Sequence, residues 1–394
     1  MESRSAEQCR RHRRHFGGAK PNQGKGDRIM NTPASKDTLK IGILEGDDIG
    51  HEVVPASVRI AKAAAAATGL AIEWVDVPIG HRALVQLGHT MPEGTLETLG
   101  GLDGWILGPI GHQGYPKVPE AINPHPILRK RFDLFANVRP TRSFPGIGCL
   151  YDDVDLVIVR ENNEGFQPDR NVVMGSGEFR PTNDVTISVR VITVEGSSKV
   201  ARAAFEIARS RTKRLTLVHK NTVYKLGCGM FVDSCYEVAK DFPDVTVDEV
   251  IVDTMAMRLV RDPQSFDTIV TTNMFGDILT DEAAGLVGGM GMAPGLCIGR
   301  GSIAMAQATH GSAPDIAGKD IANPFAMVES TRMLFDWLGR RHGLDAAVEV
   351  SELMKKGIDT ALSNPATRTP DIRGTANQSQ MVDGIIAGMG IANA

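Results

Sequence analysis

The chain has 394 residues, of which 42% are hydrophobic and 23% are charged, and its net charge is −4. This is the composition of a globular protein that is long enough to form two or more lobes. The sequence contains no run of about 18 apolar residues, which argues against a transmembrane helix. Its mild negative charge is not the signature of a general nucleic-acid binder.

The start of the chain differs from the rest. Residues 1–37 are rich in basic side chains and lack apolar periodicity, so we predict a disordered basic extension there. A transit peptide, or a nucleic-acid-binding arm within residues 1–29, is an alternative interpretation. Because the segment has no amphipathic pattern, we favour an extension without a function of its own.

The cysteines show no spacing that is typical of a metal site. Their number is odd and the chain is long, which favours free thiols in a reducing compartment and hence a cytoplasmic protein. The five residues are Cys9, Cys149, Cys228, Cys235 and Cys297.

Strands and helices alternate along the chain, which predicts an α/β protein. Apolar β-rich runs predict strands within 38–44, 72–80, 95–111, 133–146, 155–165, 187–193, 215–220, 245–260 and 268–272. Helices are expected at 51–67, at 197–211 and over most of the chain from Asn323 onward. Residues 166–190 interrupt the alternation and predict an arm that reaches a partner subunit.

Two aspartates, Asp277 and Asp281, follow the buried strand 268–272. Gly276 is expected to end that strand, so that residues 278–286 open a helix. Carboxylates four residues apart share one helix face, here close to a positive N-terminus. Mg²⁺ prefers such oxygen ligands and takes few of them, which leaves room for a substrate. The alternative is a charge bias at the helix start with one solvated aspartate.

Four basic residues lie at the ends of predicted elements. Lys220 ends a strand, where α/β proteins place groups that face ligands, and a partly desolvated lysine near a metal can act as a base. Arg129, Arg139 and Arg160 have the chemistry for bidentate recognition of carboxylates, as in a polyanionic acid substrate. Taken one at a time, a surface lysine and structural ion pairs are the simpler interpretations.

The segment 310–324, HGSAPDIAGKDIANP, is rich in glycine, proline and small residues. Its backbone could approach a nucleotide closely, and Asp315 could accept hydrogen bonds from ribose hydroxyls, which favours NAD over NADP. The sequence has no GxGxxG after its first strand, so the fingerprint of a Rossmann dinucleotide fold is absent.

Together these segments resemble the isocitrate/isopropylmalate dehydrogenase family of metal-dependent β-decarboxylating dehydrogenases, which also includes homoisocitrate and tartrate/D-malate dehydrogenases. The resemblance extends from Leu39 to the C-terminus. It is carried by EGDDIGHEV, LRKRFDLFANVRP, VIVRENNEG, NMFGDILTDEAAGL and HGSAPDIAGKDIANP, in this order.

The resemblance implies a role for each candidate residue. Mg²⁺ or Mn²⁺ would bind Asp277 and Asp281, together with Asp253 from the neighbouring subunit. Lys220 would take the proton of the substrate hydroxyl. The implied substrate residues are Arg129, Arg139, Arg160 and Asn123. The implied residues for the cofactor NAD are His310, Gly311, Ser312, Ala313, Asp315, Ile316 and Asn323.

The chain departs from the family pattern at several positions. Gln167 occupies the place of the tyrosine that protonates the enol, so the catalytic pair would be Lys220 and Gln167, with Tyr224 or a water as a substitute acid. Thr222 and Gln307 replace an asparagine and a glutamate. The substrate-selecting positions, from Ile122 to Pro126, match neither the isocitrate nor the isopropylmalate pattern.

The implied fold is a two-lobed α/β structure with a large mixed sheet. The first lobe would combine residues 38–137 and 288–394, and the second would be 138–287 with the arm 166–190. The implied activity is the NAD- and Mg²⁺/Mn²⁺-dependent oxidative decarboxylation of a substituted (R)-malate by a homodimer with shared active sites. Mixing Asp253→Asn with Lys220→Ala subunits is therefore expected to restore some sites.

Two rival functions remain open. Gln167 motivates a catalytically weakened regulatory subunit of such an enzyme, although a complete set of metal and substrate residues argues against it. The basic extension motivates a second, nucleic-acid-binding role. Since the rest of the chain lacks a basic signature, nucleic acid is an unlikely partner, and no membrane partner is expected.

Overall fold

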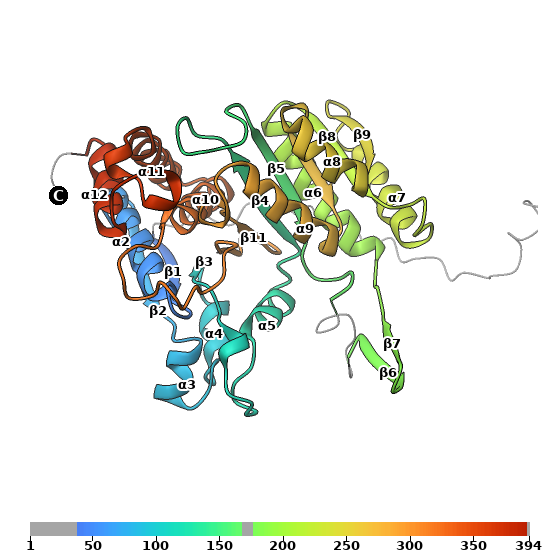
Figure 1. Cartoon of the computed structure of the whole chain (residues 1–394), viewed down its shortest axis with the longest axis horizontal. Helices are drawn as coiled ribbons and strands as arrows, with labels where there is room; N and C mark the ends of the chain where they lie inside the picture. Colours follow the sequence, from blue (N-terminus) through green and yellow to red (C-terminus); the bar gives the residue numbers. More distant parts are fainter. Residues whose placement is uncertain (1–37, 168–175, 392–394) are drawn as a thin grey trace, which may run out of the picture. The chain divides into compact units, whose positions relative to one another are not determined.

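A mixed sheet of ten strands forms the frame of the structure, a computed structural model that describes residues 38–167 and 176–391 (Figure 1). The strand order is β2-β1-β3-β12-β11-β4-β5-β10-β8-β9. Strands at both ends of the sheet pair in parallel, whereas β11 pairs in antiparallel fashion with both its neighbours, as does β4 with β5. The α/β class and the large mixed sheet expected from the sequence are confirmed.

Eight of the ten strands of the sheet agree with the β-rich runs of the sequence, although most are shorter than those runs, whereas β11 and β12 were not predicted. The sheet contains β1 Thr38–Leu44, β2 Ala71–Asp76, β3 Gly104–Leu107, β4 Ala136–Arg142, β5 Asp155–Glu161, β8 Arg214–His219, β9 Thr246–Ile251, β10 Thr268–Thr271, β11 Leu296–Ile298 and β12 Ala304–Ala306. All four residues of β10 and six of the seven in β5 are buried. Continuous apolar strands of this kind are typical of a sheet that is covered on both faces.

Helices pack around the two ends of the sheet. Helices α2 Gly50–Thr68, α10 Phe325–His342, α11 Asp345–Ser363 and α12 Gln378–Gly388 pack on one another near β1 and β2 (Figure 1). Helices α6 Val194–Ser210, α7 Gly227–Ala239, α8 Val252–Arg261 and α9 Asn273–Leu286 lie around β5, β8, β9 and β10. The shorter helices are α3 His81–Leu87, α4 Thr95–Gly100 and α5 Pro124–Arg131. No helix within the described ranges is both long enough and apolar enough to cross a membrane.

A separate two-stranded ladder occupies part of the predicted arm. Strands β6 Glu178–Thr182 and β7 Val185–Ser188 pair with each other, and every one of their residues is exposed (Figure 1). Beyond Ser188 the strand expected over 187–193 continues only as an isolated bridge between Val191 and Gly165. Residues 168–175 of the arm and the extension 1–37 lie outside the described residues.

The parallel strands β5, β10 and β8 bring their carboxyl ends to one edge of the sheet. Thr271 at the end of β10 is in register with Arg160 of β5 on one side and Val218 of β8 on the other. Lys220 follows β8 directly, and α9 follows β10. Because ligands of open α/β sheets bind outside the carboxyl ends of the strands, this edge is the expected location of a ligand site.

Candidate active site

Arginines from two strands meet the two aspartates of helix α9 at this edge. Arg160 of β5 and Arg139 of β4 are both buried. Arg160 Nη1 donates a very short hydrogen bond to Asp277 Oδ1, and Arg139 Nη1 lies 3.5 Å from Asp281 Oδ1 and 3.9 Å from Asp277 Oδ1. Both carboxylates are about half exposed, so they have free faces toward solvent. The structure therefore brings these four predicted residues together.

Helix α9 begins earlier than the sequence predicted. It starts at Asn273, and Gly276 lies inside it rather than ending the strand. A Cβ atom at residue 276 would lie 2.6 Å from Cγ of Arg160, so the glycine makes room for that side chain. Asp277 is consequently in the second turn of the helix. The expectation that the positive N-terminus of the helix lies close to the two aspartates is therefore wrong, because the field of the helix dipole fades within the first turn.

Asn273 connects Arg160 to the segment that carries Gln167. Its Oδ1 accepts hydrogen bonds from Arg160 Nε at 3.0 Å, from Arg160 Nη2 at 2.7 Å and from Gln167 Nε2 at 3.3 Å. Gln167 thus lies beside the arginine–aspartate cluster and is not a surface amide. An amide has no accessible acidic proton, so Gln167 can orient a ligand or a water but cannot act as a general acid.

The charges of this cluster are strongly coupled. Burial lowers the pKa of Arg139, opposed by the neighbouring Asp277 carboxylate. Burial likewise raises the pKa of Asp281, opposed by Arg139. On the other side of Arg160, Glu161 is buried and accepts backbone N–H groups from Asn163 at 2.7 Å and Glu164 at 2.9 Å. Burial raises the pKa of Glu161 to about 7.

Arg129 lies in α5 and is also buried, but it is linked to a different neighbour. Its Nη2 is 3.5 Å from Gln307 Oε1, and Gln307 Nε2 is 2.7 Å from Nε2 of His125. The Nε atom of Arg129 is buried with no hydrogen-bond partner among the described residues. A buried guanidinium nitrogen without a partner is costly unless an anion satisfies it. Asn123, predicted to bind substrate, caps the helix by accepting the His125 N–H at 3.1 Å.

Lys220 and Asp253 form a second cluster. Asp253 lies in the first turn of helix α8, and its carboxylate accepts a very short hydrogen bond from Lys220 Nζ, which lowers the pKa of Asp253. Within the described part of one chain, no three acidic, histidine or cysteine side chains gather as a metal site would require. The structure therefore does not bring Asp253 to Asp277 and Asp281 in a single chain.

This pairing overturns one expectation. Lys220 and Asp253 belong to the same half of any site that two subunits share, because they are ion-paired within one chain. Mixing Asp253→Asn with Lys220→Ala subunits would therefore leave every site with a defect. This ion pair could not be predicted from the sequence, since the two residues are 33 positions apart.

The predicted cofactor loop lies beside the turn after β1, but its residues have different surroundings. Gly311 and Ser312 line a cavity, and Ile49 N–H donates to the Ser312 carbonyl at 3.1 Å. Ala313 has a φ of +44°, and Asp315 is exposed, with its backbone carbonyl accepting from Lys319 Nζ at 2.7 Å. Ile316 is half-buried against the hydrophobic core.

Asn323 is buried, whereas His310 is half-buried, with its Nε2 atom shielded from solvent. Asn323 accepts the Phe325 N–H at the start of α10 and donates to Asp371 Oδ2 at 2.9 Å. His310 Nδ1 is 3.0 Å from the Gly311 carbonyl, and its Nε2 is buried without a partner among the described residues. Burial lowers the pKa of His310, so a neutral ring with an accepting Nε2 fits this place.

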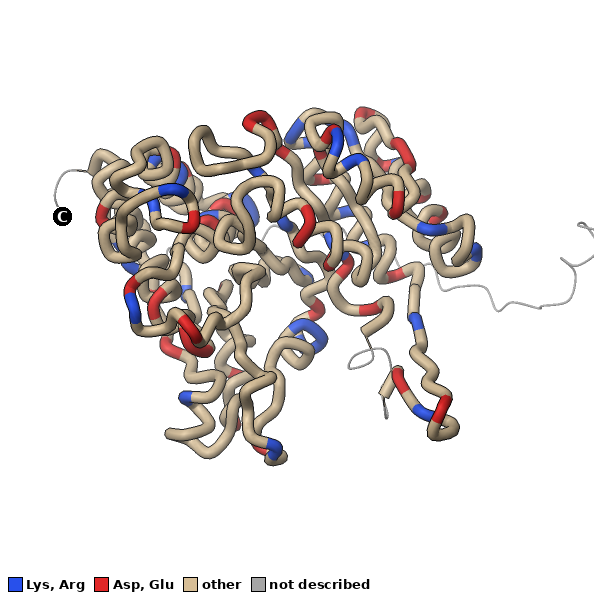
Figure 2. The backbone as a smooth tube through the Cα atoms, in the orientation of Figure 1, with Lys and Arg blue, Asp and Glu red and all other residues tan. Residues whose placement is uncertain are grey.

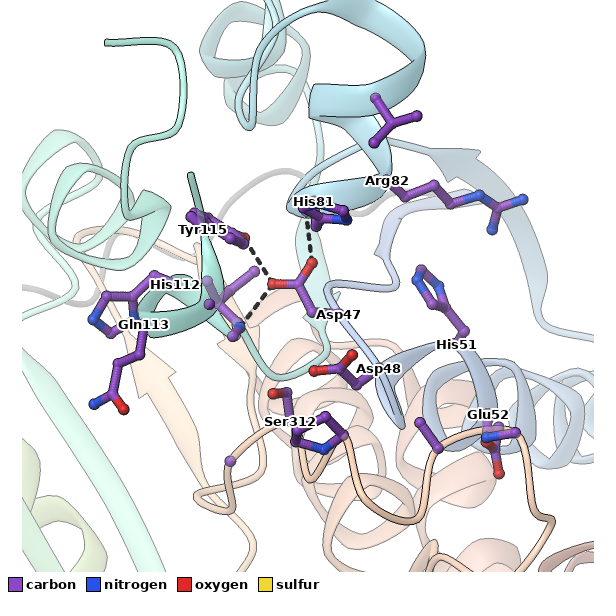
Figure 3. Close-up of a pocket in the computed structure, with 18 of the residues that line it drawn as sticks. Asp47, Asp48, His51, Glu52, His81, Arg82, His112, Gln113, Tyr115 and Ser312 are labelled. Carbon is purple, nitrogen blue, oxygen red and sulfur yellow. Dashed lines mark hydrogen bonds between the residues drawn. The ribbon is translucent and has the colours of Figure 1, made fainter. Parts of the chain in front are cut away.

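A cavity of about 1080 Å³ adjoins the loop (Figure 3). It is lined by residues of the turn after β1, of α3, of the segment 110–115 and of the loop 311–318. A volume of this size is in the range of cofactor and ligand sites. Nothing in the sequence marked the α3 and 110–115 contributions, because they become neighbours of the loop only through the sheet.

Asp47 holds the walls of this cavity together (Figure 3). Its Oδ1 accepts the His81 N–H at 2.6 Å, while its Oδ2 accepts the Gly111 N–H at 2.7 Å and the Tyr115 hydroxyl at 2.7 Å. Burial, and then the hydrogen bond to Asp47, raises the pKa of Tyr115 far above its usual value. Sequence reasoning missed Asp47; its position in the turn EGDDIGHEV was the only available signal.

Comparison with known proteins agrees with this geometry. A family model described as isocitrate/isopropylmalate dehydrogenase matches residues 40–385. The chain is 42% identical over 348 residues to an isocitrate/homoisocitrate dehydrogenase of Thermus thermophilus, covering 88% of this chain and 97% of that protein. It is 37% identical over 345 residues to a 3-isopropylmalate dehydrogenase of Methanothermobacter thermautotrophicus, covering 87% and 96%.

A solved structure shares the fold. The crystal structure of isocitrate dehydrogenase from Methylococcus capsulatus superimposes with a TM-score of 0.76 and 35% sequence identity, and the match covers 89% of this chain and 99% of that one. With the arginine–aspartate cluster at the carboxyl edge of the sheet and a family match over nearly all described residues, the chain belongs to the isocitrate/isopropylmalate dehydrogenase family of oxidoreductases.

Proposed function

We propose that the chain catalyses the NAD-dependent and Mg²⁺- or Mn²⁺-dependent oxidative decarboxylation of a substituted (R)-malate of the isopropylmalate, isocitrate, homoisocitrate or tartrate/D-malate type. The observation that carries the proposal is the meeting of Arg139 and Arg160 with Asp277 and Asp281 at one sheet edge. Buried cations beside half-exposed carboxylates suit an anionic substrate and a hard cation at the same place.

The substrate carboxylates would bind the three buried arginines. Arg139 and Arg160 already face carboxylates of α9, and Arg129 has a buried Nε without a partner in the described residues. A planar guanidinium binds a carboxylate through two parallel hydrogen bonds, which fixes orientation as well as supplying attraction. His125, held by Gln307 close to Arg129, is then the side chain best placed to contact the substituent of the malate.

The metal would bind Asp277 and Asp281 of one chain and Asp253 of a second chain. The donor set fits, because it consists of carboxylate oxygens only, and each of the three side chains is about half exposed or more. The bound cation would supply Lewis-acid stabilisation of negative charge on the substrate oxygens. When the site assembles, Asp253 would exchange part of its contact with Lys220 for the metal.

Lys220 would then be the proton acceptor. Its amine lies at the end of β8 and is half-buried, and its present partner is a carboxylate that the metal would share. Lys220 Nζ would take the proton of the 2-hydroxyl, and NAD, when bound, would supply the acceptor for the hydride of the carbon that bears this hydroxyl. Carbon dioxide leaves from the neighbouring carbon, and the resulting enol must regain a proton. Gln167 lies at the cluster but has no proton to give.

NAD would bind against the loop 310–324 and the cavity beside it. The buried Nε2 of His310 lacks a partner in the described residues and can accept a hydrogen bond from an amino or hydroxyl group of the nucleotide. Asp315 is exposed and could receive ribose hydroxyls, whereas its charge would repel a 2′-phosphate. Gly311 and Ser312 line the cavity through which the rest of the cofactor would pass.

A homodimer would complete the site. The neighbouring helices α8 and α9 expose the apolar side chains of Met257, Val260 and Ile278, which is unusual unless a partner covers them. The ladder β6–β7 is a lone hairpin whose residues are all exposed, and such a hairpin is only marginally stable without packing. A second copy on this side would bring its Asp253 and Lys220 toward Asp277 and Asp281, with the lobes 38–137/288–394 and 138–287 on either side of the cleft.

A catalytically weakened subunit is the second candidate, and the position of Gln167 beside Asn273 is what favours it. A nucleic-acid-binding role would depend on residues 1–29, which lie outside the described part. Along the described ranges, Lys and Arg are interspersed with Asp and Glu in the view of Figure 2.

A substrate panel tests the proposed reaction. Purified protein is incubated with NAD and Mn²⁺ and, in turn, isopropylmalate, isocitrate, homoisocitrate, tartrate and D-malate, and NADH and carbon dioxide are both measured. We expect equimolar NADH and carbon dioxide with at least one acid, abolished by excess chelator. No turnover with any of them would favour the weakened subunit, and full activity in chelator would exclude the metal role.

A further inference from the structure

Arg190 lies between the ladder β6–β7 and helix α6, and its side chain is enclosed by aromatic rings. The guanidinium carbon lies 5.0 Å from the ring centre of Tyr224, 5.6 Å from that of Phe275 and 5.7 Å from that of Phe166. Phe166 and Tyr224 also meet each other edge to face at 6.3 Å. Three rings from three distant segments therefore share one cation.

Polar contacts add to this arrangement. The Arg190 nitrogens lie 3.5 and 3.6 Å from Sγ of Cys228 and 3.4 Å from Oγ1 of Thr272. The same sulfur accepts the backbone N–H of Lys220 at 3.4 Å. A chain of contacts thus runs from Arg190 through Cys228 to the lysine backbone.

The contacted segments are those that carry the proposed chemistry. Phe166 directly precedes Gln167, and Tyr224 donates its N–H to the Lys220 carbonyl at 2.8 Å. Thr272 is the N-cap of helix α9 and Phe275 lies in its first turn, and the same helix carries Asp277 and Asp281, which would bind the metal. We propose that Arg190 is a positioning residue that fixes the Lys220–Cys228 segment, the Gln167 segment and the start of α9 relative to one another; the roles of those groups rest on the proposed function.

The chemistry of arginine suits this task. A guanidinium is planar, so it can lie against several ring faces, and its N–H groups can reach sulfur and hydroxyl acceptors at the same time. A lysine would keep the charge but lose the plane and most of the donors. A methionine would keep the length of the side chain but lose the charge, the planar group and the N–H donors. Gly227 leaves room for the guanidinium, since a Cβ there would lie 3.2 Å from Arg190 Nη1.

The test compares Arg190→Met and Arg190→Lys with Arg209→Met in the full chain. Arg209 is a matched control, since its guanidinium also lies over a ring, that of Phe242 at 4.3 Å, but it touches no proposed site residue. Two properties are measured: hydrogen exchange of the backbone amides in 220–228 and 272–276, and kcat and KM for the substrate found in the panel. The substrate deuterated at C2 supplies a kinetic isotope effect.

We expect faster amide exchange in both segments for Arg190→Met, a smaller increase for Arg190→Lys, and none for Arg209→Met. We expect kcat to fall by about 10²-fold with little change in either KM, because a misplacement of about 1 Å at the reacting groups costs that much. The isotope effect should rise, since a purely structural loss of active protein would leave it unchanged. Unchanged exchange in both segments would overturn the proposal whatever the activity. If the parent protein is inactive with every substrate but Arg190→Met still shows faster amide exchange, the positioning role is supported and the proposed function is contradicted.

Discussion

Replacing Asp47 by asparagine should disrupt the cavity beside the cofactor loop. The carboxylate accepts three hydrogen bonds from donors in two segments, one at Oδ1 and two at Oδ2. An amide can keep the Gly111 N–H and the Tyr115 hydroxyl on its oxygen, but its NH₂ group then faces the His81 N–H. At least one bond is lost, and two donors confront each other in a buried place.

The expected size follows from these contacts. A hydrogen bond to a charged group contributes about 1.5–3 kcal/mol, and a buried donor left unsatisfied costs about 1–3 kcal/mol. We therefore expect Asp47→Asn to lower the free energy of unfolding by about 2.5–6 kcal/mol. Because the wall formed by α3 and residues 110–115 is loosened, NAD binding should weaken by about tenfold or more, which corresponds to about 1.4 kcal/mol.

Two controls isolate the effect. Asp383→Asn makes the same chemical change at an exposed carboxylate, which pairs with Arg59 Nη2 at 2.7 Å and does not line the cavity. It should change the free energy of unfolding by less than about 1 kcal/mol and leave NAD binding unchanged. Tyr115→Phe removes a single donor and should cost about 1 kcal/mol. Urea unfolding and equilibrium titration with NAD measure the two quantities. If Asp47→Asn matches Asp383→Asn in both assays, the assignment of Asp47 as the support of this cavity is refuted.

Three further predictions concern the cofactor, pH and the final proton. NAD should give a higher kcat/KM than NADP because Asp315 repels a 2′-phosphate, and a preference for NADP would contradict this role. Burial raises the pKa of Glu161 from 4.5 to about 7, so the folded protein keeps a proton on this carboxyl that the unfolded chain has already lost. The resulting stabilisation is complete below pH 4.5 and is lost as the pH rises through 7. The total loss in the free energy of unfolding is about 3 kcal/mol. Urea unfolding between pH 5 and pH 8 should show this slope, and Glu161→Gln should remove it; an equal slope in both proteins would count against a buried, protonated Glu161. Gln167 cannot act as a general acid, and general acid catalysis contributes about 10²–10⁴-fold to a rate. The first turnover should therefore show a burst of NADH, and Gln167→Tyr should raise the steady-state rate. Identical rates for Gln167→Tyr, Gln167→Ala and the parent, without a burst, would show that Gln167 has no effect on catalysis.

Much of the site was predictable because the relevant signals are local. Strands that end at one edge carry Arg160 and Lys220 to that edge, and the spacing of Asp277 and Asp281 places both on one helix face. The start of α9 was not predictable, because Gly276 looks like a helix breaker until Arg160 is seen packed against it.

What sequence reasoning could not supply depends on contacts between distant segments. Asp47 gains its importance from donors at 81, 111 and 115, which only the folded sheet brings near it. The rings around Arg190 come from three segments with no common pattern. Lys220 and Asp253 form an ion pair although they are distant in sequence, so no spacing rule could predict that they would lie in the same half of the proposed shared site.

The claim that two chains build one active site is tested most directly by subunit mixing. Asp253→Asn and Asp281→Asn chains, each inactive alone, are dissociated, mixed in equal amounts and reassociated, and the dehydrogenase activity is measured. The two defects lie in opposite half-sites, so each mixed dimer should contain one intact site and about a quarter of the parental activity should return. Asp253→Asn mixed with Lys220→Ala is the control and should regain none, because both defects lie in the same half-site. Mixed dimers that form in the first mixture without any recovery, or equal recovery in both mixtures, would contradict the account.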